Sequence, residues 1–482
     1  MLRTRFRLGL AAMAAIILAA CGGGDSSATG GAGAGTGGAT AERAVVTSGV
    51  ITGFGSVYVN GIHFETNGAE ISKDGERVTQ QGLRVGQVVH VRGRIDDRSG
   101  RATADSVRQD DDLEGPITSI DAANQTFVVL AHTVRVTTET SFDDSLGTFA
   151  DLTVGCRVEI SGLKNAAGEV VATRIEKRKA GETRLEVMGK VSLLDTTART
   201  FRIGPLTVDY TGASLRDFPA SGLANDQNVE VKGTALNGAG ALVATSVELR
   251  DYEHSSGSYQ REVEGLITRY VSATDFDVAG RKVTTTSTTR YEHGTAADLA
   301  LNVKVEAEGT IDAAGVLVAV KVEFKRGNNA GLAGIVDNVT ADSSGLGGTL
   351  TVLGVTVTVD NNTRIEDKSD ADIEMFRLSN VQVGDYVEIR GTETAPLRLT
   401  ASRLEREDRE TRSWVRGTVR DLVAPNMTVL GVPVSTSAST RFEEVSATDF
   451  FANAAGRVVK AKGIETANQI AATEIEFEDH DD

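Results

Sequence analysis

Cysteine, proline and aromatic side chains are scarce in this sequence, and the shortage of cysteine excludes a class of protein. The 482 residues include two cysteines, Cys21 and Cys156, with six prolines, one tryptophan and 5% aromatic residues. Two cysteines cannot form the set of disulfides that holds small secreted domains together. Apart from residues 8–20, no stretch is apolar enough to suggest a membrane-spanning helix, so we expect a soluble body.

Catalytic and metal-binding motifs are also missing from the sequence. Its six histidines lie in no HExxH motif and in no Cys/His cluster with metal-ligand spacing. Neither GxSxG nor GxxxxGK[ST] occurs. We therefore predict that the protein is not an enzyme and that it has no catalytic residue, cofactor or metal site.

The charge balance argues against nucleic acid as a partner. The formal net charge is −17, and residues 1–20 contain three arginines and no acid, so their removal makes the chain more negative still. A nucleic-acid-binding protein carries a basic face that neutralises phosphates. We expect no nucleic-acid partner.

The N-terminus has the order of features found in an export signal. Arg3, Arg5 and Arg7 precede the apolar run 8–20, which is too short to span a bilayer. The segment Leu-Ala-Ala-Cys ending at Cys21 resembles a bacterial lipobox, which implies lipidation of Cys21 and a mature chain beginning there. An ordinary cleaved secretory signal with a chance cysteine is the alternative. By resemblance to bacterial lipoprotein sorting signals, Gly22 implies the outer membrane, with the periplasmic or surface side open. The following residues, 21–44, are rich in glycine and predict a flexible tether.

One phrase recurs six times in the rest of the chain, for example LRVGQVVHVRG at 83–93 and VGDYVEIRG at 383–391. Within each copy apolar residues alternate with polar ones, which predicts a half-buried strand with its polar column facing solvent. That polar column consists of His90, Glu159, Glu230, Glu306, Glu388 and Lys460. Each copy closes on a glycine, at Gly93, Gly162, Gly233, Gly309, Gly391 and Gly463.

Two further columns of the repeat predict local backbone geometry. Seven residues before each closing glycine the chain has only Gly, Asp or Asn. These residues most easily adopt positive φ, so the column predicts a left-handed turn at the strand entrance. These are Gly86, Gly155, Asp226, Asn302, Gly384 and Gly456. The strand after each phrase has an alanine column, which indicates close approach of another backbone or side chain; it consists of Ala104, Ala172, Ala244, Ala319, Ala401 and Ala472.

A hairpin and a glycine-containing strand precede each phrase, as in LTVLGVTVTV at 350–359. Each repeat therefore predicts three strands, a variable insert with a short helix or loop, and two more strands. This is the order of the five-stranded oligonucleotide/oligosaccharide-binding (OB) barrel. We predict an all-β protein with six tandem small OB-like barrels; an open sheet or a small sandwich is the alternative.

The pattern GxITGFGSVYVNGIxF, then LRVGQVVxVRG, then an Ala-Thr/Ser-x-Val/Ile strand resembles the domain of unknown function 5666, found in exported bacterial lipoproteins. The match is best in the first repeat and looser in the others, since the third and fourth have Asp226 and Asn302 in place of glycine. The resemblance implies no established activity and no functional residue. The predicted organisation is a signal peptide at 1–20, the lipidated Cys and tether at 21–44, and β modules 1 to 6 at 45–110, 111–180, 183–253, 260–326, 329–408 and 411–478.

Few residues outside the repeats suggest a site. The acidic runs Asp110–Asp112 with Glu114 and Asp367–Glu374 are interpreted mainly as solvated charge, with weak divalent-cation binding as the alternative. Cys156 is expected to be partly exposed and without a neighbour that activates its thiol. A sugar-binding face would need aromatic platforms or planar amides, and the candidate platforms are Tyr58, Tyr210, Tyr270 and Tyr291.

We therefore expect a non-enzymatic cell-envelope lipoprotein, anchored in the membrane by its N-terminal lipid, that presents tandem β-barrel modules to an envelope or extracellular ligand. A polysaccharide, an envelope protein or a cation are the candidate ligands. Repetition without a catalytic constellation supports this, because several weak sites on one chain give avidity. The alternative is a structural spacer or assembly component of the envelope with no small ligand.

Overall fold

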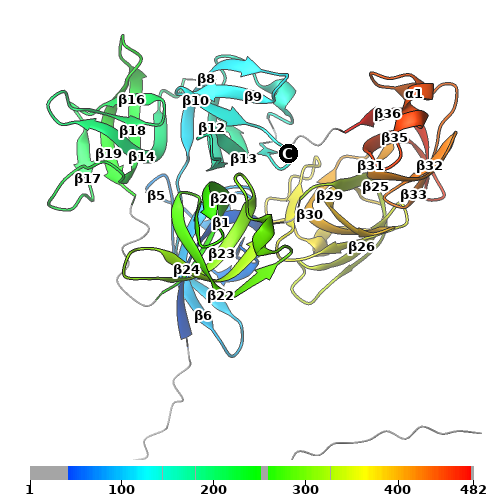
Figure 1. The fold of residues 1–482 in the computed structure, drawn as a ribbon, viewed down its shortest axis with the longest axis horizontal. Coiled ribbons are helices and arrows are strands. Elements are labelled where there is room, and N and C mark those ends of the chain that lie inside the picture. Colours follow the sequence, from blue (N-terminus) through cyan, green and yellow to red (C-terminus); the bar gives the residue numbers. More distant parts are fainter. Residues whose placement is uncertain (1–41, 144, 180, 251–258, 326, 479–482) are drawn as a thin grey trace, which may run out of the picture. The chain divides into compact units, whose positions relative to one another are not determined.

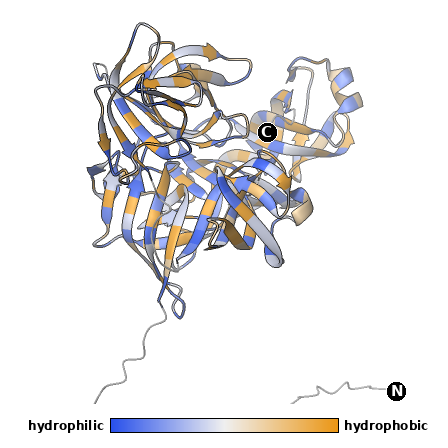
Figure 2. Cartoon of the chain, turned by 60° about the vertical axis from the view of Figure 1, so that its left-hand side comes forward, coloured by the Kyte–Doolittle hydropathy of each residue, from blue (hydrophilic) through white to orange (hydrophobic). Residues whose placement is uncertain are grey.

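The computed structural model describes residues 42–143, 145–179, 181–250, 259–325 and 327–478. The predicted signal peptide, Cys21 and most of the tether lie outside these residues, as do His254 and His480. The described part is mostly β and contains one short α-helix, α1. Its strands alternate apolar and polar residues, so that each ribbon is banded in Figure 2.

Module 1, drawn in blue in Figure 1, folds into a five-stranded barrel. Its elements are β1 (Glu42–Phe54), β2 (Val57–Val59), β3 (Ile62–Glu65), β4 (Glu70–Lys73), β5 (Glu76–Arg77), a 3-10 turn (Gln80–Gly82), β6 (Val88–Asp96) and β7 (Ala102–Gln109). β1 pairs with β2 and β6, β2 pairs with β3, β3 runs parallel to β7, and β7 pairs with β6. The ring closes in the order β1–β2–β3–β7–β6, which leaves no unpaired edge within it.

Modules 2 and 3 repeat the five main strands and the short insert strand of module 1, without a counterpart of β5. Module 2 has β8 (Leu113–Asp121), β9 (Thr126–Val129), β10 (His132–Arg135), β11 (Ser141–Phe142), a 3-10 turn (Phe149–Asp151), β12 (Arg157–Lys164) and β13 (Val170–Lys177). Module 3 has β14 (Leu185–Asp195), β15 (Thr200–Ile203), β16 (Leu206–Asp209), β17 (Ser214–Arg216), β18 (Asn228–Leu236) and β19 (Leu242–Leu249).

Module 4 lacks a separate strand in its insert, because its third strand continues through that region. It has β20 (Gln260–Ser272), β21 (Asp275–Val278), β22 (Arg281–Glu292), a 3-10 turn (Ala296–Asp298), β23 (Lys304–Ile311) and β24 (Leu317–Phe324).

Modules 5 and 6 complete the series. Module 5 has β25 (Ala330–Ala341), β26 (Gly348–Val352), β27 (Val355–Val359), β28 (Arg364–Asp367), a 3-10 turn (Leu378–Asn380), β29 (Tyr386–Ala395) and β30 (Arg398–Glu407). Module 6 has β31 (Ser413–Val423), β32 (Asn426–Val429), β33 (Val432–Ser435), β34 (Arg441–Phe442), α1 (Ala447–Asn453), β35 (Val458–Thr466) and β36 (Gln469–Phe477).

The pairings of module 1 recur in modules 2 to 6. In each, the first strand pairs with the second and fourth, the second with the third, the third runs parallel to the fifth, and the fifth pairs with the fourth. The inserts hold an element that the sequence pattern does not predict. A short strand there, β4, β11, β17, β28 or β34, runs parallel to the last strand of its module.

First strands also join the modules in pairs. β8 pairs with β14, which joins modules 2 and 3, and β25 pairs with β31, which joins modules 5 and 6. β1 pairs with β20 in parallel, Val45 opposite Gln260 and Ser48 opposite Val263, so module 1 joins module 4 rather than its neighbour in sequence. The three resulting sheets have 12 strands each.

The predicted left-handed turn is confirmed at all six positions. The φ angles run from 66° at Asn302 to 98° at Gly384, with the other four between these values. Asp and Asn stand at two of these positions because their side chains tolerate the left-handed region better than those of most residues.

The closing glycine and the alanine of the last strand are small for the same reason, because they lie opposite each other where two strands approach closely. In every module the closing glycine is opposite the alanine of the last strand, and the register shifts at that glycine, which marks a β-bulge. A Cβ at Gly463 would overlap the carbonyl oxygen of Ala471 and lie 2.8 Å from the Cα of Ala472. The expected close approach is therefore between the backbones of the last two strands.

Apolar side chains fill the interior of each module. Modules 1 and 4 each have a buried cluster of their own, although Tyr58 of module 1 belongs to the cluster of modules 5 and 6. The clusters of modules 2 and 3 are continuous, as are those of modules 5 and 6. The pairs that are adjacent in sequence thus share apolar packing as well as backbone hydrogen bonds. Among the described residues, no helix is both long and apolar enough to pass through a membrane.

Candidate functional site

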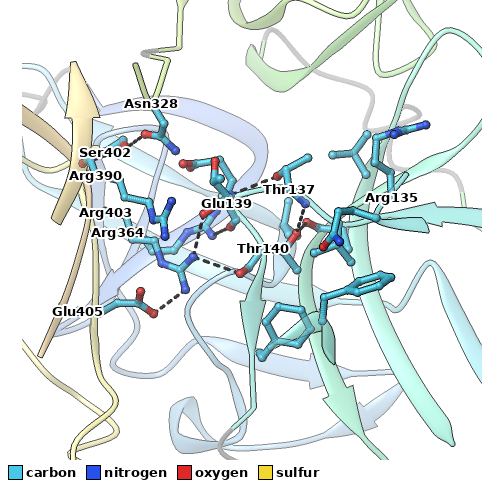
Figure 3. Close-up of a pocket in the computed structure, with 18 of the residues that line it drawn as sticks. Arg135, Thr137, Glu139, Thr140, Asn328, Arg364, Arg390, Ser402, Arg403 and Glu405 are labelled. Atoms are coloured by element: carbon cyan, nitrogen blue, oxygen red, sulfur yellow. Dashed lines mark hydrogen bonds and ion pairs between the residues drawn. The ribbon is translucent and has the colours of Figure 1, made fainter. Parts of the chain in front are cut away.

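A cleft of about 2050 Å³ lies among modules 2, 4, 5 and 6, with a small contribution from module 1. Module 2 contributes the turn between β8 and β9, the segment after β10, and the hairpin between β12 and β13. Module 5 contributes residues of β29 and β30, and module 6 contributes the start of β31 and two lysines of β35. The two sides face each other in Figure 3, where Arg364, Arg390 and Arg403 lie opposite Thr137 and Glu139.

Two arginines of module 5 tie the sides of the cleft together. Arg403 donates to the carbonyl oxygens of Thr138 and Thr140, each at 3.1 Å. Arg364 donates to the carbonyl oxygen of Glu139 and is itself buried. Thr140 is fixed in turn, because its hydroxyl donates to the carbonyl of Ala172 at 2.7 Å. The floor of the cleft is therefore preorganised by hydrogen bonds.

Most charges in the cleft already have partners. Arg135 pairs with Glu169 at 3.0 Å on the module 2 side, and Arg390 pairs with Glu388 at 2.6 Å on the module 5 side. Such preformed pairs leave hydrogen-bonding edges for a ligand without presenting strong net charge.

Burial shapes the titration of this region. Burial opposes charge on Arg403, but Glu405 and Glu366 beside it raise the pKa of its guanidinium overall. Burial lowers the pKa of Arg364. Burial, followed by the carboxylates of Glu405 and Glu388, raises the pKa of Glu407 to about 8. Glu407 lines the cleft, so the neighbouring carboxylates favour its protonated form there.

A few polar groups in the cleft have no partner in the protein. The side-chain nitrogen of Asn328 and one carboxylate oxygen of Glu139 are buried without a hydrogen bond. An unsatisfied buried polar group costs free energy. These two groups are therefore positions at which a polar ligand or water gains hydrogen bonds.

The aromatic part of the cleft differs from the sequence expectation. Trp414 lines it, with the guanidinium of Arg390 5.9 Å and the ammonium of Lys460 5.2 Å from its ring centre. None of the four tyrosines expected as platforms lines the cleft. Tyr58 is instead buried and stacked on His63, with ring centres 4.4 Å apart, and Tyr210 packs against Phe201.

The column expected to face solvent is largely buried, which corrects that expectation. Glu159, Glu230 and Glu306 are at most 2% exposed, while His90, Glu388 and Lys460 are half-buried. The alternation is correct, but part of the outer face of a module is covered by another module. At Glu159, for example, the cover includes Lys73 of module 1, whose ammonium lies 2.5 Å from the carboxylate.

The interpretation of Asp110–Asp112 and Glu114 as solvated charge is also wrong. All four are buried. Asp110 pairs with Arg108 at 2.8 Å, and a carboxylate oxygen of Asp112 accepts the backbone N–H of Gly162 at 2.9 Å. In the other acidic run, Asp367 is buried and pairs with Arg406, whereas Asp370, Asp372 and Glu374 are exposed.

Among the residues that the structure describes, Cys156 and the histidines form no reactive arrangement with one another. Cys156 is half-buried and burial raises the pKa of its thiol, which disfavours the thiolate. His132 is buried, and its Nδ1 lies 2.8 Å from the carbonyl oxygen of Leu130. Burial lowers the pKa of His90 to about 4. Cys21, the predicted lipid site, lies outside the described residues.

Sequence reasoning missed the cleft because its residues come from several modules. Within one module, Thr137, Ser402 or Arg403 is an ordinary polar residue of a strand or turn. The signal that was available is indirect: an outer column rich in charge on a strand of a repeat protein indicates contact with another repeat as well as solubility.

Comparison with known proteins gives a family. Six segments match the family described as "Domain of unknown function (DUF5666)": residues 43–108, 114–176, 188–248, 264–323, 333–405 and 416–476. Among solved structures, one titled "drosophila Unr CSD456" matches with 16% identity over 42% of this chain and 88% of that chain, at a TM-score of 0.11. The comparison with curated proteins found no match.

Proposed function

The chain belongs to the DUF5666 family, of which it has six tandem domains, and we propose that it is a non-enzymatic lipoprotein of the bacterial cell envelope that binds a polysaccharide. In this proposal lipid on Cys21 holds the protein in the outer membrane and the glycine-rich tether separates the modules from the lipid surface. Each module is an OB-like barrel. Its closed five-strand pairing, with an insert between the third and fourth strands, supports that assignment.

The observation that carries the binding proposal is the position of module 2 in the cleft. In OB barrels the loops between strands 1 and 2 and between strands 4 and 5 bind oligonucleotides or oligosaccharides. In module 2 these are the β8–β9 turn and the β12–β13 hairpin, and residues of both line the cleft, including Asn124, Gln125 and Asn165. The opposite wall belongs to modules 5 and 6, so a bound chain would contact several modules at once.

The chemistry of the lining favours a polyhydroxylated ligand. Ten lysines and arginines and nine acidic residues line the cleft, so its net charge is close to zero in a chain of −17. Seven amide side chains and eight side chains with a hydroxyl group line it as well. Planar amides and paired charges offer many donors and acceptors in fixed directions. An acidic polymer would meet as many carboxylates as bases, so we favour a neutral polysaccharide.

Trp414 gives a direct test, because it is the one tryptophan of the chain and lines the cleft. The full chain in detergent is titrated with cello-, malto- and chitohexaose while tryptophan fluorescence and binding heat are followed. We expect saturable binding of at least one of these probes. Asn328→Ala and Asn124→Ala should weaken it several-fold, whereas Gln382→Ala, an exposed amide that does not line the cleft, should leave it unchanged. If both cleft variants bind the oligosaccharide as tightly as the original chain, the binding site lies elsewhere.

A structural role is the second candidate, supported by a separate observation. The outer carboxylates of the fourth strands take part in ion pairs, some of them between modules, such as Lys73 with Glu159. That use of the outer face suits an assembly component or spacer. Absence of binding by every oligosaccharide, together with intact folding, would favour this role over polysaccharide binding.

A further inference from the structure

The tip of the β4–β5 hairpin of module 1 enters a group of buried acidic side chains from modules 2 and 3. Asp74 at this tip is buried, and its backbone carbonyl accepts a hydrogen bond from the ammonium of Lys232 at 2.7 Å. One of its carboxylate oxygens accepts the backbone N–H of Asp111 at 3.3 Å. The hairpin is therefore held by both neighbouring modules.

Three carboxylates converge at this point, from Asp74, Glu186 and Glu230. One oxygen of each lies within 4.8 Å of one oxygen of each of the other two. Glu186 is 0% exposed and Glu230 is 2% exposed, and each has one carboxylate oxygen, Oε1, without a hydrogen-bond partner in the protein. Buried carboxylates with unpartnered oxygens require a cation or a proton to offset their charge.

The bases around this group are shared with other acids. Arg184 contacts Asp74 at 3.3 Å and also Glu186 and Glu114. Lys232 lies 3.1 Å from Glu230 and 3.9 Å from Glu186. Arg250, whose side chain is fully buried, pairs with Oε2 of Glu230 and also contacts Asp110 at 3.6 Å and Glu248. The side chains of Arg184 and Lys232 are partly exposed, Lys232 at 22%, so the ammonium of Lys232 can turn towards solvent.

We propose that Asp74, Glu186 and Glu230 form a calcium site that ties module 1 to module 3. All three ligands are hard carboxylate oxygens, which suit calcium and magnesium rather than softer metals. Calcium–oxygen distances of about 2.3–2.6 Å put opposite ligands about 4.6–5.2 Å apart, which accommodates the spacing of these oxygens; magnesium at about 2.0–2.1 Å needs a tighter set. Three carboxylates leave the remaining positions to water, so the affinity belongs with weak extracellular sites, with Kd of about 10⁻⁴–10⁻³ M.

The alternative occupant is a proton shared between Glu186 and Glu230. Burial, and then the neighbouring carboxylate of Glu230, raises the pKa of Glu186 well above its ordinary value. Calcium must displace that proton, so its binding strengthens as pH rises and releases protons. A group held only by a shared proton gives no response to calcium at any pH.

The test is calorimetric titration of the full chain, freed of metals with a chelator, with calcium chloride at pH 6 and pH 8, together with thermal unfolding. We expect binding that is tighter at pH 8 and a melting temperature that rises with calcium. Glu186→Gln should weaken calcium binding at least tenfold. Glu262→Gln, which removes a buried carboxylate of module 4 outside this group, should leave calcium binding unchanged.

A second variant keeps the test decisive if Glu186→Gln folds poorly. Lys232→Met removes a base that competes with calcium, so it should bind calcium more tightly than the original chain. A purely structural ion-pair cluster predicts only lower stability for this variant, with no calcium response. The proposal is overturned if neither the original chain nor Lys232→Met responds to millimolar calcium, or if magnesium binds equally well. It is also overturned if Glu186→Gln binds calcium as tightly as the original chain.

Discussion

Replacing the closing glycine of module 6 by alanine tests the bulge on which every module depends. A Cβ at Gly463 would overlap the carbonyl oxygen of Ala471 and lie 2.7 Å from its carbonyl carbon. These are backbone atoms of a paired strand, so relief requires the last two strands to separate by a substantial fraction of an ångström. Overpacking of this kind costs roughly 1–3 kcal/mol, and backbone displacement adds to it. We expect Gly463→Ala to destabilise module 6 by about 2–4 kcal/mol.

The single tryptophan makes this loss measurable in one module. Trp414 is in β31, directly opposite Lys462, the residue before the bulge, and it is 6% exposed. Its fluorescence therefore reports unfolding around the bulge. With a urea slope of about 1–2 kcal/mol per molar for a unit of this size, the midpoint should fall by at least about 1 M.

Gly417 supplies the matched control in the same module. It also lies in β31, and a Cβ there would meet its nearest neighbour, the backbone nitrogen of Leu430, at 3.4 Å, an ordinary contact. Gly417→Ala should shift the midpoint by less than about 0.5 M. A Gly463→Ala midpoint within about 0.3 M of the original would refute the argument that the closing glycine exists to admit the neighbouring strand.

Three further predictions concern single side chains. Burial, then Glu306 and Glu308, raises the pKa of Glu262 to about 8, so the folded chain keeps a proton that the unfolded chain releases above about pH 4.5. Its contribution to the free energy of unfolding therefore falls as pH rises to about 8, by up to about 1.4 kcal/mol per unit; urea midpoints should favour Glu262→Gln over the original at pH 8 and not at pH 5. Cys156, whose pKa is raised by burial, should react with iodoacetamide at pH 8 about tenfold more slowly than free cysteine, and unfolding in urea should remove the difference. Cys21→Ser should abolish incorporation of labelled palmitate in bacteria, whereas Cys156→Ser should leave it intact; labelling that survives Cys21→Ser would contradict the lipid-anchor proposal.

The repeating local structure could be predicted because its causes act within a few residues. Positive φ at Asp226 and Asn302 follows from the small set of residues that tolerate it, and the backbone approach at Ala472 follows from a column that stays small in every copy. These are constraints of sterics and alternation, and they recur in every copy of the repeat. Short strands such as β28 were not predicted from the sequence, because their pairing involves too few residues to produce a recognisable pattern.

The candidate site could not be predicted because it is made of contacts between modules. Period-two alternation says that Glu159 points away from the apolar core of its own barrel, which is correct, but not whether water or another module lies beyond it. In the structure the ammonium of Lys73 lies there, contributed from module 1. The same limit applies to Arg403 at the cleft, whose partners Thr138 and Thr140 are in a different module. A single copy of the repeat carries no information about which copy it will touch.

This arrangement has a consequence for how the protein is held together. An isolated module would expose its outer charged column to water, where carboxylates on a strand cost little. In the whole chain the same carboxylates lose that water, and desolvation of a buried ion pair can exceed the attraction within it. The apolar clusters shared by modules 2 and 3 and by modules 5 and 6 offset this cost within each pair. Module 1 shares no such cluster with module 3, and its hairpin tip meets that module through Asp74, Lys232 and the acidic group around them. The contact between modules 1 and 3 is therefore the one expected to respond most to pH and to divalent cations.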